Sequence, residues 1–270
     1  MQITVKGQMA YAYTGGKPFD RELPAVVFLH GAQLDHSCWN LQSRWFGHHG
    51  FGVLAVDLPG HGRSSGTPLG SIEELAQWVD ALLSSVALEQ AALVGHSMGS
   101  LIAMEAALQF PSRISRLALL GSTLPMPVSA ALLDAAWHNE PKAVAMVNSF
   151  SHSSSAQIGG NAVPGLWMMG MNQRLMERQR PGVFGCDMNA CNAYARTLTD
   201  LSAIRQPTLI LAGNQDRMTP LKASRALASA IATARFEVLA GAGHALMAEQ
   251  PDHVLNHLRD FFTTIKKLPA

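Results

Sequence analysis

The sequence has few cysteines and little net charge, and each shortage excludes a class of protein. Its three cysteines (Cys38, Cys186 and Cys191) are too few, and odd in number, for a disulfide framework. Cys186 and Cys191 have no second cysteine pair to join them, so the spacing predicts no zinc site. A formal net charge of +1 gives no electrostatic attraction toward nucleic acid or an anionic membrane.

Long apolar runs and a secretory signal are also missing. No run approaches the roughly 18 consecutive apolar residues that a membrane-spanning helix needs. The first residues, MQITVKGQMAYAYTGG, lack the basic start and the apolar block of a secretory signal. We therefore expect a cytoplasmic protein with no membrane span and no nucleic-acid partner. A homodimer stays open.

Short aliphatic runs alternate with longer helical segments along most of the chain. Five of these runs are almost wholly apolar, as is typical of strands buried on both faces of a parallel sheet: 25–30, 52–57, 91–96, 116–121 and 207–213. Runs at 2–5 and 9–14 precede them, and a more polar run at 235–241 is expected near an edge. The pattern predicts an α/β fold with a mostly parallel, eight-stranded sheet and helices on both faces.

One region breaks the alternation. Residues 123–203 contain no convincing core strand, and their composition shifts toward Met, Trp, Asn and Gly. We interpret 123–203 as a helical lid inserted after the sixth strand, between core segments 1–122 and 204–270. Within the lid, 166–182 has helical character, whereas 151–161 (SHSSSAQIGGN) is expected to be a flexible loop.

Ser97 lies in the stretch LVGHSMGS, between a predicted strand and a predicted helix. Gly95 and Gly99 remove side chains that would crowd a sharp strand-to-helix turn. The helix that follows directs its N-terminal N–H groups toward the serine oxygen, where they favour negative charge. Ser97 is therefore the candidate nucleophile, and a loop serine that only caps the helix is the alternative.

A serine hydroxyl needs a base, and the base needs an acid to orient it. Asp216 follows the strand at 207–213, and His244 lies in a glycine-rich loop after the last strand. Functional groups in such sheets meet at the carboxyl ends of the strands. Asp216 would fix the tautomer of His244, and His244 would accept the proton of Ser97.

Other histidines and carboxylates fit these roles less well. His30 and His96 flank the expected site, and we interpret both as loop-organising residues. Asp187 lies in the lid and follows no core strand. His253 and His257 lie four apart on the last helix, without a glutamate between them or an evident third ligand. We predict no metal and no cofactor.

Five segments resemble the α/β-hydrolase superfamily, and the resemblance extends over nearly the whole chain. They occur in the order of that family: FLHGAQLDHSCW, AVDLPGHGRSS, GHSMG, GNQDRMTP and GAGHALMAEQP. The resemblance implies an oxyanion hole formed by the backbone N–H groups of Ala32 and Met98. It also assigns Asp57 and His61 to a structural turn, and it places a cap where we expect the lid.

In that family, dehalogenases and epoxide hydrolases carry aspartate at the strand-to-helix turn, which we call the elbow. Here the elbow carries Ser97, and a serine at this position favours a reaction through an acyl-enzyme. We expect a carboxylesterase-like hydrolase that cleaves a small, fairly apolar acyl compound. Lid residues are expected to contact this substrate: Trp137, Trp167, Met168, Met169 and Met171.

Three further functions stay open. The first is carbon–carbon bond hydrolysis of a ring-cleavage diketone, whose carboxylate would need a cation from Arg174, Arg178 or Arg180. The second is thioester hydrolysis or cofactor-free peroxidase chemistry. The third belongs to another class, a slow or non-catalytic receptor for a small ligand.

Overall fold

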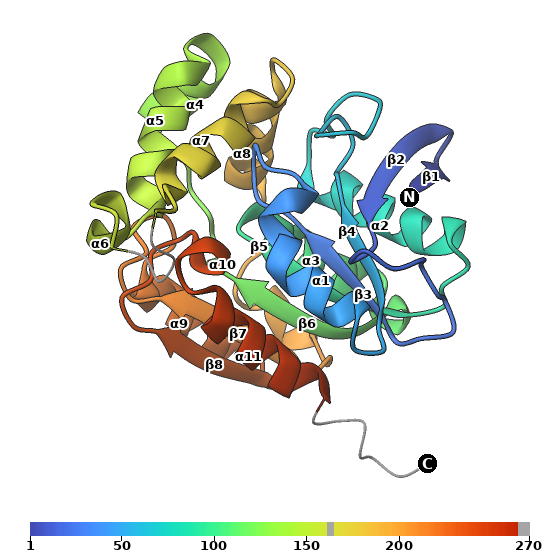
Figure 1. The fold of residues 1–270 in the computed structure, drawn as a ribbon. Helices are drawn as coiled ribbons and strands as arrows, with labels where there is room; N and C mark the ends of the chain where they lie inside the picture. Colours follow the sequence, from blue (N-terminus) through green and yellow to red (C-terminus); the bar gives the residue numbers. More distant parts are fainter. Residues whose placement is uncertain (161–164, 264–270) are drawn as a thin grey trace.

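A single mixed sheet forms the centre of the molecule in the computed structural model, which describes residues 1–160 and 165–263 (Figure 1). Its strands are β1 (Gln2–Val5), β2 (Gln8–Tyr13), β3 (Ala25–Leu29), β4 (Gly52–Val56), β5 (Ala91–His96), β6 (Ile114–Leu120), β7 (Thr208–Gly213) and β8 (Ala234–Leu239). They lie in the order β1-β2-β4-β3-β5-β6-β7-β8, and all pairs from β4 to β8 are parallel. The predicted eight-stranded sheet is confirmed, with β8 at an edge as expected.

Helices cover both faces of this sheet. They are α1 (Asn40–Gly47), α2 (Ile72–Ser85), α3 (Met98–Gln109), α9 (Leu221–Ala230), α10 (Leu246–Glu249) and α11 (Pro251–Thr263). Successive side chains of a strand point to opposite faces, so Phe28 packs in the cluster that contains Phe46 of α1 and Phe262 of α11. Its neighbour Leu29 packs in the cluster of α2 and α3. The strands are therefore buried on both faces, as their apolar composition predicts.

Five α-helices of the described residues lie between β6 and β7, and we call them the helical insertion. They are α4 (Ala130–His138), α5 (Glu140–Ser151), α6 (Ser154–Gln157), α7 (Met168–Glu177) and α8 (Val183–Ala193). They gather at one end of the sheet (Figure 1). The division of the chain into a core and a lid stays a prediction.

The expectation of a flexible loop over 151–161 is wrong for much of its length. Helix α5 continues to Ser151, and α6 begins after Ser153, whose Oγ accepts a hydrogen bond from the N–H of Ala156. Serine is a strong N-cap residue, so a cluster of serines can start a helix as readily as form a loop. Asn161, the last residue of that stretch, lies outside the described residues.

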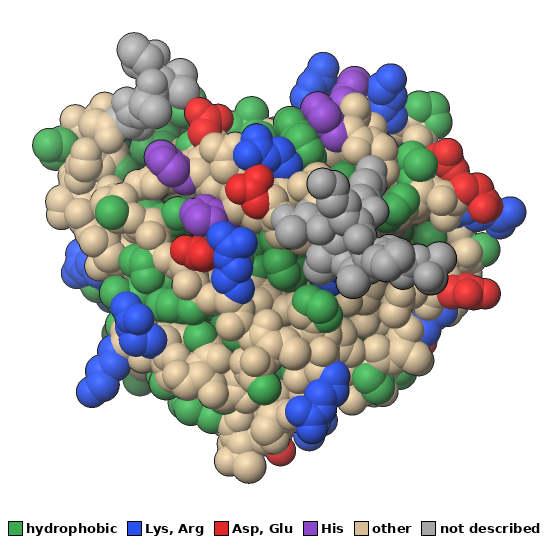
Figure 2. Space-filling view, turned by 90° about the horizontal axis from the view of Figure 1, so that it is seen from below, with side chains coloured by type: hydrophobic (Ala, Val, Ile, Leu, Met, Phe, Trp, Pro, Cys, Tyr) green, Lys and Arg blue, Asp and Glu red, His purple; other side chains and the backbone are tan. Residues whose placement is uncertain are grey.

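Charges of both signs are scattered over the face shown in Figure 2, without a patch of one sign. This distribution agrees with the net charge of +1. Within 1–160 and 165–263, no helix is long and apolar enough to cross a bilayer.

Candidate active site

Ser97 occupies a strained turn between β5 and α3. Its φ of 52° and ψ of −118° are rare for a residue with a side chain, and such backbone strain costs on the order of 1–3 kcal/mol. A methyl group on Gly95 would overlap the carbonyl of Gly99, and one on Gly99 would overlap the carbonyl of Leu29. The two glycines therefore allow the elbow to pack directly against β3.

Asp216 is fixed by four hydrogen bonds, one of them to His244. Its Oδ2 lies 2.8 Å from Nδ1 of His244 and accepts a 2.6 Å bond from Oγ1 of Thr219. Its Oδ1 accepts bonds from the N–H groups of Met218 and Thr219, at 2.8 and 2.7 Å. Burial raises the pKa of Asp216, but His244 and these hydrogen bonds outweigh it and lower the pKa below its usual value. The ionised carboxylate accepts the Nδ1 proton of His244, which leaves Nε2 free to act as a base.

The backbone of the His244 loop is held from two sides. The carbonyl of Ser151, at the end of α5, accepts bonds from the N–H groups of His244 and Ala245, at 2.7 and 3.0 Å. His96 Nε2 donates a 2.9 Å bond to the carbonyl of His244. Burial and the neighbouring His244 lower the pKa of His96 to about 3, so its ring is neutral. His96 is thus placed to orient the loop, in agreement with its expected role.

Ala32 and Met98 supply two backbone N–H groups on either side of the elbow. Ala32 follows β3 and Met98 is the first residue of α3. Neither N–H has an acceptor among the described residues. A methyl group on Gly31 would lie 3.2 Å from Cβ of Ser97, so the loop that contains Ala32 runs directly beside the serine. Both amides are therefore available to stabilise an oxyanion next to Ser97.

His30 organises the start of this loop. Its Nδ1 donates to the carbonyl of Gly31 at 2.8 Å, and its Nε2 accepts the N–H of Leu58 at 3.1 Å. Burial and the neighbouring His61 lower the pKa of His30 to about 4. A neutral, fully buried His30 is a structural part of the loop and not a proton carrier.

A cavity of about 690 Å³ lies at the elbow, and Ala32, Ser97 and His244 all line it. Most of its other lining side chains are apolar, among them six methionines: Met168, Met171, Met176, Met188, Met218 and Met247. Methionine is flexible and polarisable, so such a wall adapts to apolar groups of different shape.

Of the lid residues expected to contact substrate, Met168 and Met171 line the cavity, and Trp137, Trp167 and Met169 do not. The ring of Trp137 packs against the backbone of Gly185, and that of Trp167 packs against Gly170. Both indoles are also partly exposed to solvent, at 48% and 69%. Trp137 thus packs α4 against α8, whereas Trp167 lies against the first turn of its own helix, α7.

The three arginines considered as carboxylate ligands already have partners. Arg178 lines the cavity and donates a 2.8 Å bond from Nε to the buried Asp35. Arg174 also lines it and pairs with Glu177 at 2.6 Å. Arg180 is not a lining residue and donates to backbone carbonyls of the turn after β4. Binding a substrate carboxylate would have to compete with these contacts.

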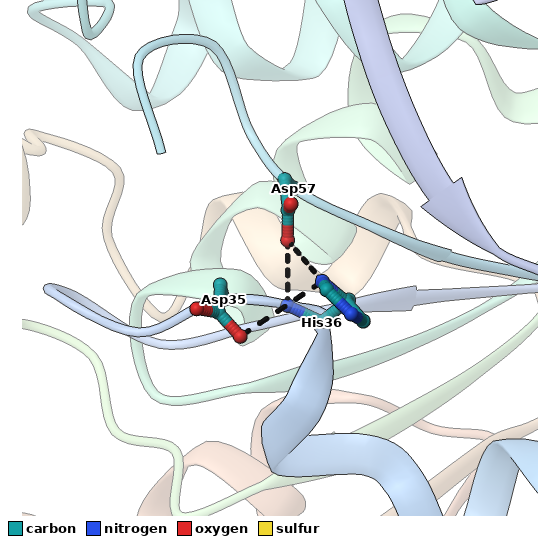
Figure 3. Close-up of side chains that lie close together, drawn as sticks. All are labelled: Asp35, His36 and Asp57. Atoms are coloured by element: carbon teal, nitrogen blue, oxygen red, sulfur yellow. Dashed lines mark hydrogen bonds and ion pairs between the residues drawn. The ribbon is translucent and has the colours of Figure 1, made fainter. Parts of the chain in front are cut away.

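Asp35, His36 and Asp57 form a compact group whose potential metal-binding atoms lie within 4.8 Å of one another (Figure 3). Hydrogen bonds account for this arrangement. Asp57 accepts the N–H and the Nδ1 proton of His36, at 2.8 and 2.7 Å, while Asp35 accepts bonds from the residues that follow it and from the insertion. The group belongs to the packing beneath the insertion, and it does not include His253 or His257.

Comparisons with known proteins agree with this fold. A model of the alpha/beta hydrolase family matches residues 26–258. The 2-hydroxy-6-oxo-2,4-heptadienoate hydrolase of Pseudomonas putida is 30% identical over 77% of this chain and 77% of its own. The pimeloyl-[acyl-carrier protein] methyl ester esterase of Aromatoleum aromaticum is 29% identical over 85% and 94%. The enol-lactonase of Burkholderia xenovorans has the same fold, with a TM-score of 0.86 and 24% identity over 97% of this chain and all of that one.

Proposed function

Because this chain belongs to the alpha/beta hydrolase family, we propose that it is a serine hydrolase that cleaves carboxylic esters with a neutral, apolar acyl group. One observation carries the proposal. Ser97 and His244 line the same apolar cavity, and His244 Nδ1 lies 2.8 Å from the ionised Asp216.

In the first half of the reaction, the Oγ of Ser97 attacks the ester carbonyl carbon and His244 Nε2 accepts its proton. The carbonyl oxygen becomes an oxyanion between the N–H groups of Ala32 and Met98. Collapse of this intermediate breaks the bond to the alcohol, which leaves with the proton from His244. Asp216 stabilises the imidazolium while it exists.

In the second half, a water molecule attacks the acyl-enzyme. His244 accepts a proton from that water and returns it to Ser97 as the acid product departs. Each turnover therefore consumes one ester and one water, and it releases one alcohol and one acid.

The test is a series of aryl esters with acyl chains from acetyl to decanoyl, assayed with wild type, Ser97→Ala and Ser229→Ala. Ser229 lies on α9 and serves as the matched control. We expect turnover with wild type and Ser229→Ala, and a loss on the order of 10⁶ with Ser97→Ala, measured to the limit of detection. Absent turnover in wild type, or undiminished turnover in Ser97→Ala, refutes the proposal.

Carbon–carbon bond hydrolysis is the second candidate, because the Pseudomonas putida relative is named for a diketone-type substrate and Arg178 lines the cavity. The existing pairing of Arg178 with Asp35 disfavours it. Adding 2-hydroxy-6-oxo-2,4-heptadienoate to the same assay separates the two. A kcat/KM above that of the best ester, together with a raised KM in Arg178→Met for this substrate alone, would favour the second candidate.

A further inference from the structure

The loop that carries Ala32 contains a strained residue at its centre. Gly31 to Leu34 form a tight turn, closed by a 3.3 Å bond from the N–H of Leu34 to the carbonyl of Gly31. Its third residue, Gln33, has a positive φ of 58°, which residues other than glycine rarely adopt. Surrounding contacts must therefore hold Gln33 in place.

Those contacts come from the helical insertion. The N–H of Gln33 donates a 2.8 Å bond to Oδ2 of Asp187 in α8. Its side-chain Nε2 donates to Oε1 of Glu140 and to the carbonyl of Met176, both at 3.1 Å. Gln33 is fully buried, so the insertion and not solvent fixes its conformation.

Asp187 is itself anchored to the core by His61. The Nε2 of His61 lies 2.9 Å from Oδ2 of Asp187, and its Nδ1 lies 3.0 Å from the carbonyl of Pro59. Both partners are acceptors, so the ring satisfies both contacts only when both nitrogens carry protons. The side chains of His61 and Asp187 are each 1% exposed, so the two form a buried ion pair.

We propose that Asp187 is a positioning residue for the oxyanion loop. Its carboxylate fixes the Ala32–Gln33 peptide, and because neighbouring peptides share the Cα of Ala32, it thereby restricts the direction of the Ala32 N–H. The insertion then does more than enclose substrate, since it completes the geometry around the developing oxyanion. This inference rests on the proposed function, in which the Ala32 N–H stabilises that oxyanion.

A purely structural contact between the insertion and the core provides the comparison. Arg180 donates to the carbonyls of Ser64 and Gly66, at 2.7 and 3.3 Å, and does not touch the Gly31–Leu34 turn. Its loss should loosen the insertion without moving Ala32. Asp187→Leu, which removes the acceptor at similar size, should change the turn directly.

The experiment measures kcat and KM on the best aryl ester for wild type, Asp187→Leu, Asp187→Asn and Arg180→Met, with the melting temperature of each. Complete loss of an oxyanion donor lowers turnover by about 10²–10³, so a displaced donor should lower kcat of Asp187→Leu by about 10–100-fold. We expect KM to change by less than about threefold, because Asp187 itself does not line the cavity. Asp187→Asn keeps an acceptor for the Gln33 N–H and should restore most of kcat, while Arg180→Met should retain wild-type kcat.

Two results would overturn this role. One is an equal fall in kcat for Asp187→Leu and Arg180→Met at matched melting temperatures. The other is a change confined to KM. If Asp187→Leu does not fold, Asp187→Asn and Asp187→Ala carry the same comparison. Failure of the proposed function looks different, because wild type itself would then not turn over the ester.

Discussion

At the scale of single residues, the imidazole of His244 leaves no room for a methyl group on Gly121. That methyl group would lie 2.9 Å from Nδ1 and 3.0 Å from Cε1 of His244, and Gly121 has a φ of +55°. We expect Gly121→Ala to displace the imidazole and lower kcat by about 10–100-fold, since a shift of about 1 Å can cost that much. Steady-state kinetics on the aryl ester measure the effect.

Gly7→Ala is the control for this substitution. Gly7 has a φ of +77° and no atom within 4 Å of the added methyl group, so it carries the backbone strain without the clash. We expect Gly7→Ala to lose about 1–2 kcal/mol of stability and to keep wild-type kcat. Equal kcat values for the two variants would show that the clash with His244 is absent.

Asp216→Asn tests the charge of the orienting carboxylate with its shape retained. The amide would present an N–H group toward His244 or leave Nδ1 facing a neutral oxygen, and either change destabilises the imidazolium. We expect kcat to fall by about 10⁴ while the melting temperature stays close to that of wild type. A loss below tenfold would assign the acid role to another residue.

Ser97, Asp216 and His244 could be proposed from the sequence as one group because each lies at or just after the end of a predicted strand. The strand pattern next to each of these residues is enough to predict that it lies at the carboxyl end of the sheet. Asp187 could not be named in this way, because its contact with His61 joins positions 126 residues apart and no local motif precedes it. Trp137 and Trp167 were expected at the cavity from composition, which does not distinguish a cavity wall from a contact between helices or an exposed position.

At the scale of elements, helix α3 is held to the end of the insertion by a buried carboxylate. Glu105 of α3 accepts bonds from Arg196 at 3.0 Å and from the hydroxyl of Tyr194 at 2.8 Å. Its side chain is fully buried, whereas that of Arg196 is 39% exposed. The pair therefore links the helix behind the nucleophile to the segment that leads back into β7.

Arg196→Met should leave Glu105 buried beside weaker, uncharged partners, Tyr194 and Gln109. Removing one member of a buried ion pair costs about 3–5 kcal/mol, and the exposure of Arg196 reduces this to about 2–3 kcal/mol. Urea unfolding at pH 7 measures the difference. Glu105→Gln with Arg196→Met should recover part of the loss, because the uncompensated charge is then removed. No recovery in the double variant would contradict a charge effect.

The strands could be predicted almost completely, since a strand buried on both faces is nearly all apolar. The start of β6 was the exception, because Ile114 begins it and the more polar Ser115 and Arg116 follow. The insertion was predicted only as helical. Its helices pack on one another and on the core turns, so their boundaries depend on contacts distant in sequence.

At the scale of the whole molecule, two buried groups join the insertion to the core. Asp35 accepts bonds from Arg178 and Gln179 at the end of α7, and His61 pairs with Asp187 of α8. Both contacts lie under the insertion and next to the loop that contains Ala32. Under the role proposed for Asp187, the attachment of the insertion and the geometry of the site depend on the same buried charges.

The His61–Asp187 pair should make this attachment sensitive to alkaline pH. Burial lowers the pKa of His61, but the Asp187 carboxylate and the Pro59 carbonyl raise it, and the net result is a raised pKa. Asp57 acts in the same direction, and the nearby His30 is neutral. A histidine with a raised pKa in the folded state contributes full stability below its unfolded pKa of about 6.5. That contribution is lost as the pH rises through the pKa of His61 in the folded protein.

We expect the melting temperature of wild type to fall between neutral and alkaline pH by more than that of His61→Gln, whose side chain does not titrate. Differential scanning calorimetry across this range measures both slopes, and parallel slopes would mean that His61 carries no proton in the folded protein.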